Sequence, residues 1–195
     1  MKKICIVLVA LFCSSLFANE KVNKNIDYQN EIYLSVGLPS GYTLGESFFD
    51  YASTKMPDTD YDFLYPKGPG IEMGFSHFFM PNFAAGFECN YEMGQYTVYN
   101  SESSLKIKDD FNHRISLMGN VSFLFPKKYF ITYIKLGAGA CFNVGSHWEN
   151  YVKVIPAIQF CPVGLKFLFG NDISLFTELN IGMNNFLSVG LTKGF

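Results

Sequence analysis

The chain has 195 residues, of which 49% are hydrophobic and only 16% are charged, whereas an ordinary soluble domain has roughly 25% charged residues. This length fits one domain, and the abundance of Phe and Tyr excludes a disordered chain. A formal net charge of −2 provides no basic surface for a phosphate backbone, so we expect no nucleic-acid partner.

The N-terminus has the pattern of a secretory signal peptide. Lys2 and Lys3 give a positive start, residues 4–12 form a short apolar core, and Ala18 is a small residue that suits cleavage. An apolar run this short cannot cross a membrane as a helix, which argues against a membrane anchor. We therefore predict a signal peptide over residues 1–18 and one mature domain over residues 19–195.

Apolar and polar residues alternate along most of the mature chain. In residues 111–125, for example, Leu117 and Val121 belong to an apolar face, and Ser116 and Asn120 belong to a polar face. A period of two predicts β-strands. The eight segments with this pattern are residues 32–38, 71–79, 83–93, 111–125, 130–144, 152–169, 173–183 and 187–195.

The segment 152–169 changes its parity part-way along. Its apolar positions are even before Pro162 and odd after it. Proline within a strand belongs at an edge or a bulge, because it has no N–H to donate. We predict a bulge at Pro162, with Pro156 as the alternative position.

The connections between these segments alternate in length. The longer ones are residues 39–68, 96–110 and 145–150, the tight turns are residues 80–82, 126–128 and 170–172, and a very short last loop is Asn184-Asn185. Short turns at one end and longer loops at the other, with both termini at the tight end, are typical of bacterial outer-membrane barrels. Since no segment after the signal is long and apolar enough for a spanning helix, a closed barrel is the expected way to enter a membrane.

Period two alone does not say which face points outward, because a secreted ligand-carrying barrel alternates in the same way. The polar positions here are mostly Gly, Ser and Asn, which suit a narrow lumen better than a water-facing surface. The apolar face is continuous across neighbouring strands, and a soluble monomer does not expose such a patch. We therefore predict an all-β fold, an eight-stranded antiparallel up-and-down transmembrane β-barrel.

The last segment, residues 187–195, alternates polar or small residues with apolar ones and ends in Phe195. On this segment, the signal peptide and the loop asymmetry, the chain resembles the small eight-stranded outer-membrane barrels: the membrane domain of outer membrane protein A and the protein X/Ail and protein W families. The resemblance implies a location in the bacterial outer membrane, contact with its lipid, and an assembly signal read by the barrel-assembly machinery. Ser188, Gly190 and Phe195 match that signal, and Lys193 departs from it.

If the polar parity points inward, the lumen contains equal numbers of acidic and basic residues. These are Glu72, Glu88, Glu92 and Glu178, and Arg114, Lys135, Lys153 and Lys166. We expect Glu88 to pair with Arg114 and Lys166 with Glu178, because buried charges need partners and these residues lie on sequential strands. The network forms either a closed plug or a gated path for protons or small polar solutes.

Aromatic residues occur near both ends of the predicted strands, where interfacial girdles form. Those near the tight turns are Phe78, Phe79, Phe83, Phe125, Tyr129, Phe130, Phe169 and Phe195, and those near the other rim are Tyr96, Phe111, Phe142, Trp148 and Tyr151. We expect Cys89 and Cys141 to be small packing residues.

No pattern for catalysis or cofactor binding is present. The lipid A deacylases among such barrels have a His-x-Ser pair, but here the residues two beyond each histidine are Phe79, Ile115 and Glu149. The mature cysteines lack zinc spacing, and the acidic stretch 47–65 lacks the pattern of a calcium loop. We expect no catalytic residues, no cofactor and no metal site.

Three functional hypotheses follow. The first is a non-enzymatic surface protein, whose loops 39–68 and 96–110 contact host or environmental ligands or which supports membrane integrity. The second is a narrow channel for small or hydrophobic solutes, as the resemblance to the protein W family implies. The third is a lipid-modifying enzyme.

Overall fold

The computed structural model describes residues 29–41, 43, 61–66, 68–99, 106–145, 152–169 and 172–195. The predicted signal peptide, residues 1–18, lies outside them, as do Trp148 and Tyr151 of the predicted girdle. Within these ranges no helix is long and apolar enough to cross a membrane.

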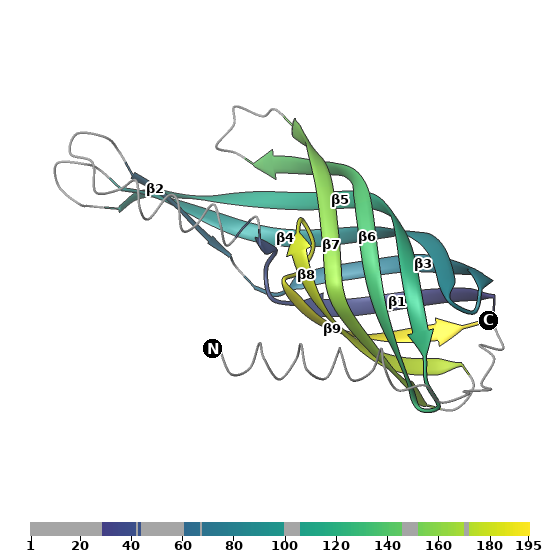
Figure 1. The fold of residues 1–195 in the computed structure, drawn as a ribbon. Coiled ribbons are helices and arrows are strands. Elements are labelled where there is room, and N and C mark those ends of the chain that lie inside the picture. Colours follow the sequence, from purple (N-terminus) through teal and green to yellow (C-terminus); the bar gives the residue numbers. More distant parts are fainter. Residues whose placement is uncertain are drawn as a thin grey trace.

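The described residues form one antiparallel sheet (Figure 1). Its strands are β1 (Asn30–Gly37), β2 (Tyr61–Pro66), β3 (Gly70–Met80), β4 (Phe83–Tyr99), β5 (Lys106–Pro126), β6 (Phe130–Gly145), β7 (Val152–Phe169), β8 (Ile173–Gly182) and β9 (Leu187–Gly194). Eight strands, β1 and β3 to β9, each pair with two neighbours within this set and close into a barrel, since β1 pairs with β9 and β4 with β5. The strand β4 also pairs with β2. The predicted eight-stranded antiparallel barrel is confirmed.

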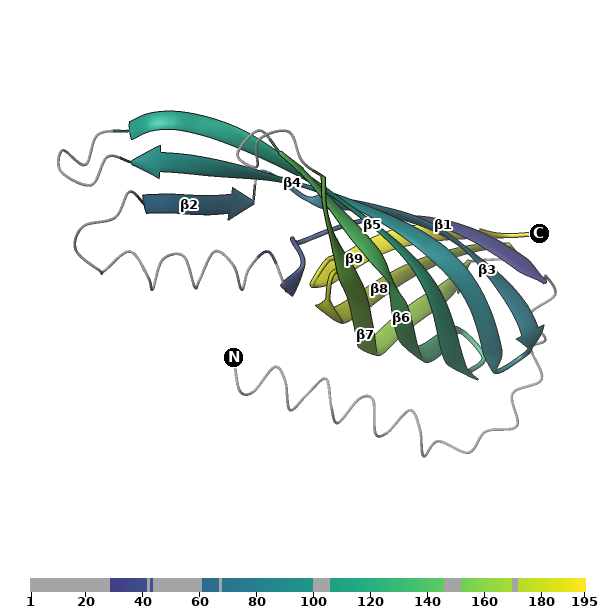
Figure 2. The ribbon, with the colours of Figure 1, turned by 90° about the horizontal axis from the view of Figure 1, so that it is seen from above.

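The strand β2 and the ends of β4 and β5 project beyond the barrel as a three-stranded arm (Figures 1 and 2). The β4–β5 pairing continues to Tyr99 and Lys106, whereas β5 starts to pair with β6 only at Asn112. The predicted loops 39–68 and 96–110 are therefore wrong in part, because both contain strand residues. Their strand residues include Tyr, Phe, Thr and Val, which favour strands, although these stretches lack a continuous apolar face.

The apolar face of the barrel points outward. Leu117 and Val189 are both 48% exposed, whereas Ser116 is 0% and Asn120 is 5% exposed. Exposed Leu, Ile, Val and Phe side chains of this kind occur on all eight barrel strands. A lipid-solvated exterior around a polar interior is the arrangement that was predicted, and it excludes a soluble ligand carrier.

The predicted bulge at Pro162 is confirmed. Between Phe160 and Val163 the register of β7 with β8 shifts, and the register with β6 shifts at the same place. The extra residue changes the parity that faces the lumen. Because of this change, both Gln159 and Lys166 are buried inside the barrel.

Candidate functional site

A cluster of four charged side chains crosses the middle of the lumen. Lys135 of β6 places its Nζ 2.9 Å from Glu178 Oε2, 3.0 Å from Glu88 Oε2 and 3.5 Å from Glu72 Oε1. The carboxylates come from β8, β4 and β3, so this ammonium connects opposite walls of the barrel. All four residues are at most 3% exposed. We call them the central cluster.

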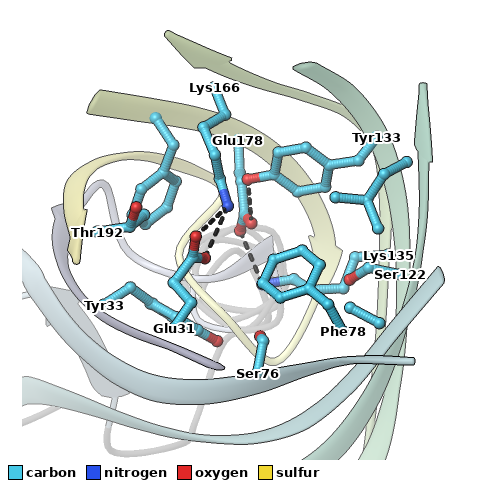
Figure 3. Close-up of a pocket in the computed structure, with 13 residues that line it drawn as sticks. Glu31, Tyr33, Ser76, Phe78, Ser122, Tyr133, Lys135, Lys166, Glu178 and Thr192 are labelled. Carbon is cyan, nitrogen blue, oxygen red and sulfur yellow. Dashed lines mark hydrogen bonds and ion pairs between the residues drawn. The ribbon is translucent and has the colours of Figure 1, made fainter. Parts of the chain in front are cut away.

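Two tyrosines, whose rings pack over glycines of the barrel wall, donate hydrogen bonds to carboxylates of the central cluster. Tyr33 Oη donates to Glu88 Oε2 at 2.8 Å. Tyr133 Oη donates to Glu178 Oε1 at 2.7 Å (Figure 3). Each ring lies over the glycine opposite it, Tyr33 over Gly74 and Tyr133 over Gly164. A glycine is required because a Cβ there would lie 2.3 to 2.4 Å from the ring.

The three carboxylates of the central cluster differ in how well they are satisfied. Glu88 also accepts hydrogen bonds from Asn120 and Asn184, and Glu178 accepts one from Asn180. Glu72 accepts only the long contact from Lys135 among the described residues, and its Oε2 is buried without a donor. Glu72 is therefore the least compensated charge of the cluster.

A second ion pair lies in the lumen towards the tight-turn end. Lys166 Nζ is 2.7 Å from both carboxylate oxygens of Glu31, and it lies over the rings of Phe78 and Tyr133 (Figure 3). A cavity of about 30 Å³ adjoins this pair and the central cluster. This volume holds roughly two water molecules. Glu31 was not among the predicted lumen residues, because the predicted strand starts one residue later, at Ile32. Glu31 nevertheless has the inward parity of β1.

A third group closes the lumen towards the long-loop end. Glu92 accepts hydrogen bonds from the Ser40 N–H at 2.7 Å, from Ser40 Oγ at 3.0 Å and from Thr43 Oγ1 at 2.7 Å. Arg114, directly opposite Glu92 in the β4–β5 register, lies 3.8 Å from it, contacts Thr43 and donates to Asn143 at 3.0 Å. The chain after β1 is thus folded across the barrel mouth. A cavity of about 10 Å³ remains there.

The loop between β8 and β9 is inserted into the lumen. Asn184 and Asn185 are 0% exposed, and Asn184 Nδ2 donates to Glu88 Oε1 at 2.8 Å. Asn90 Nδ2 donates to the carbonyl of Met183 at 3.3 Å, and Asn180 Nδ2 donates to that of Asn185 at 3.0 Å. The sequence showed only that this loop is short. Its two adjacent asparagines, whose side chains can satisfy buried polar groups, were the available signal.

Two predicted pairs and one predicted lumen residue are corrected by the structure. Arg114 pairs with Glu92 rather than Glu88, because Glu92 is its register partner. Lys166 pairs with Glu31 rather than Glu178, because Glu178 forms its ion pair with Lys135. Lys153 lies at the start of β7 and is exposed, so it is not part of the buried network. The other seven predicted residues are buried in the lumen.

The aromatic residues near the tight turns divide between the two faces. Phe79, Tyr129, Phe169 and Phe195 are exposed on the outer face, as a girdle requires. Phe78 is the exception, since it points inward and packs with Ala84, Leu124, Ile131 and Tyr133. The inward-facing positions are therefore not all polar, and apolar side chains line the lumen at this end.

The residues of the predicted assembly signal lie on β9, which closes the barrel against β1. Ser188 and Gly190 face the interior, whereas Lys193 and Phe195 are exposed outside. This placement follows the alternation of the strand.

The described part of the chain contains two histidines, His77 and His113, and three cysteines. No set of three His, Cys, Asp or Glu side chains is placed there to hold a metal ion. His77 Nδ1 contacts Asn30 Oδ1 at 2.9 Å, and His113 Nδ1 contacts Tyr91 Oη at 2.8 Å on the outer face. Cys89, Cys141 and Cys161 are free thiols.

No protein-family model and no curated protein matches the chain. The solved structures with a similar fold include Ail, the attachment invasion locus protein of Yersinia pestis, with a TM-score of 0.40 and 15% identity over 85% of this chain and 93% of that one. A structure of Ail in complex with the heparin analogue sucrose octasulfate has a TM-score of 0.38 and 13% identity over 84% of this chain and 94% of that one. These similarities concern the fold alone.

The closed ring of strands, the outward apolar face and the buried polar interior together determine the compartment. A barrel without a free edge, with lipid-facing and lumen-facing residues in alternation, is the outer-membrane type of β-protein. The chain is a bacterial outer-membrane β-barrel protein.

Proposed function

We propose that this protein is a non-enzymatic, non-conducting outer-membrane barrel that carries the β2–β4–β5 arm for contact with host or environmental partners. The observation that carries this proposal is the closed lumen. Three layers of buried polar groups, around Glu31, Lys135 and Glu92, follow one another along its axis. An eight-stranded interior is only wide enough for its own side chains, so these layers act as a plug.

The arm supports the second half of the proposal. Among the described residues, β2 pairs only with β4, and β5 over residues 106–111 pairs only with β4. Each therefore has one strand edge without a described partner. An edge of this kind offers backbone N–H and C=O groups to an added strand, while the barrel holds the arm above the membrane.

The plug is tested by conductance. We expect the refolded protein in a planar bilayer to give no reproducible single-channel openings, because the ion pairs leave no continuous water path. The control is a variant in which Asn184 and Asn185 are both replaced by Gly, which removes the side chains of the inserted loop and is expected to increase leakage. Regular openings of the wild-type protein would contradict the proposal.

The arm is tested with a shortened variant. Tyr96 and Asp110 are register partners, so residues 97–109 can be replaced by a two-residue Asn-Gly turn without altering the barrel. Bacteria that display the shortened chain should lose adhesion to immobilised host or environmental protein, and should resist detergent as well as bacteria that display the full chain. If adhesion is unchanged and only detergent resistance depends on the protein, its role is membrane integrity.

A narrow channel is the second candidate. The cavities of about 30 Å³ and about 10 Å³ at the two ends of the plug favour it, because they bring water-sized space to both sides of the central cluster. Such a path would suit protons or the smallest polar solutes. Dye-reported proton leakage through proteoliposomes, without single-channel openings for larger ions, would support this candidate over the first.

We also propose that β9 carries the signal for the barrel-assembly machinery. The support is that Phe195 is 61% exposed at the chain end, where a partner can reach it, whereas Ser188 and Gly190 face inward. Deletion of Phe195 should slow assembly in cells more than refolding in detergent. Equal slowing of both would assign Phe195 to barrel stability instead.

A further inference from the structure

The charges buried in the described part of the lumen do not balance. There are five carboxylates, those of Glu31, Glu72, Glu88, Glu92 and Glu178, and three basic groups, those of Arg114, Lys135 and Lys166. The outer layers are each matched, because Lys166 pairs with Glu31 and Arg114 with Glu92. The excess of two negative charges therefore lies in the central cluster, where burial makes an uncompensated charge costly.

Lys135 cannot compensate all three carboxylates. An ammonium has three N–H donors, and each is directed at one carboxylate, with the longest contact going to Glu72. Glu88 and Glu178 receive further hydrogen bonds from tyrosine and asparagine side chains, whereas Glu72 Oε2 receives none from the described residues. The charge that needs a partner is at Glu72.

Neutral oxygens around the cluster also lack donors. The carboxamide oxygens of Asn90, Gln159 and Asn184 are buried without a hydrogen-bond partner among the described residues. Asn90 is the register partner of Glu72, and Asn184 donates from its Nδ2 to Glu88. Each of these side chains presents an oxygen, and a buried oxygen is satisfied by a proton donor or a cation.

The oxygens of Gln159 and Glu88 are directed at one place. Gly137 of β6 leaves space on the wall, and the position that its Cβ would take is 3.5 Å from Glu88 Oε1 and 3.6 Å from Gln159 Oε1. Gln159 is the register partner of Gly137 and is 1% exposed. An unpartnered carboxamide oxygen thus lies beside Gly137 near Glu88, a carboxylate of the central cluster.

From this arrangement we propose that the central cluster binds a hard, oxygen-coordinated cation, with Glu72 as its charged ligand and carboxamide oxygens such as that of Gln159 as neutral ligands. Ca²⁺ fits best, because two positive charges balance the cluster and because Ca²⁺ accepts carboxylate and carbonyl oxygens in irregular geometry. Mg²⁺ fits less well, since it dehydrates reluctantly and demands an octahedron. Since the three carboxylates of the cluster are not placed as a ligand set by themselves, the proposed ion takes the carboxylate of Glu72 together with neutral oxygens.

The test compares the wild-type chain with Glu72→Gln, which keeps the acceptor for Lys135 and removes the charge. Each protein is refolded in detergent with a chelator, with Ca²⁺, with Mg²⁺ or with Na⁺, because the closed lumen admits ions most readily during folding. Calorimetry measures the binding stoichiometry, and the unfolding midpoint is followed by circular dichroism. At a free Ca²⁺ concentration a hundredfold above Kd, the wild-type midpoint should rise by roughly 5–10 °C.

The proposal predicts different ion binding and stability for the wild-type chain and for each variant. The wild-type chain binds one ion, Glu72→Gln loses both binding and the rise in midpoint, and in chelator Glu72→Gln is at least as stable as the wild-type chain. A purely structural Glu72 would instead make that variant less stable in every buffer. Glu92→Gln, a matched change to a buried carboxylate of another layer, should retain the ion.

Gln159→Glu covers the case in which Glu72→Gln fails to fold. It adds a charge at a proposed ligand and should tighten Ca²⁺ binding by about tenfold, since ligand charge tunes calcium affinity. Ion binding that persists in Glu72→Gln, as acidic loop residues would give, overturns the proposal. So does a wild-type midpoint that depends on pH but on none of the three ions, because protons would then balance the cluster.

Discussion

The ring of Tyr133 lies over Gly164, its register partner on β7, so closely that a Cβ on the glycine would be 2.4 Å from the ring carbons. This contact fixes the direction of the Tyr133 hydroxyl, which donates to Glu178. Since Glu178 in turn contacts Lys135, a small residue in the barrel wall positions the ion pairs at the centre of the lumen.

Gly164→Ala should therefore destabilise the barrel. The added methyl group must displace the Tyr133 ring, and overpacking of this kind costs about 1–3 kcal/mol. The measurement is urea unfolding of the refolded protein, followed by loss of the folded band on an unboiled denaturing gel. Gly119→Ala is the matched control, because the nearest atom to a Cβ there is 3.9 Å away. An equal loss of stability in both variants would show that the strand glycines matter for a reason other than the tyrosine contact.

Lys135→Met should be among the most destabilising single changes. It removes the ammonium shared by Glu72, Glu88 and Glu178 and leaves buried carboxylates uncompensated, which costs roughly 3–5 kcal/mol. The same change at exposed Lys153 should alter stability by about 0.5 kcal/mol or less. The two variants are compared by the temperature at which half of the folded band is lost on a denaturing gel. A larger effect at Lys153 would mean that the polar network lies elsewhere.

The outward orientation predicts which positions touch lipid. In a Trp148→Phe background, which removes the single native tryptophan, Leu117→Trp should be strongly quenched by lipids brominated deep in their chains. Phe79→Trp, near a tight turn and 61% exposed, should respond more to lipids brominated near the headgroup. Fluorescence of Leu117→Trp that no brominated lipid quenches would contradict a membrane barrel.

The fold could be predicted because its main determinant is local. Alternation along each strand indicates which residues face lipid, and the position of Pro162 indicates where the alternation shifts. The same parity places Glu72 and Lys135 in the lumen. Phe78 shares this inward parity with Glu72, but it was assigned to the outer girdle because aromatic residues near a tight turn are typical of a girdle.

The partners within the lumen could not be predicted, because they depend on the strand stagger around the whole ring. Glu88 of β4 reaches Lys135 of β6 rather than Arg114 on the neighbouring strand. Glu31 and Lys166 are 135 residues apart in sequence and come together only when β1 closes the barrel. The arm was missed for a different reason: its strands lack the apolar face on which the prediction relied.

A double-mutant cycle on Glu31 and Lys166 tests the pairing that sequence reasoning missed. Glu31→Gln and Lys166→Met should each destabilise the barrel, because each leaves one buried charge without its partner 2.7 Å away. Together they should cost less than the sum of the two, with a coupling of about 1–3 kcal/mol. Urea unfolding of the four proteins gives this value. The corresponding cycle of Lys166→Met with Glu178→Gln serves as the comparison and should give a smaller coupling, since Glu178 contacts Lys135. A larger coupling to Glu178 than to Glu31 would restore the pairing expected from the sequence and contradict the arrangement of the lumen described above.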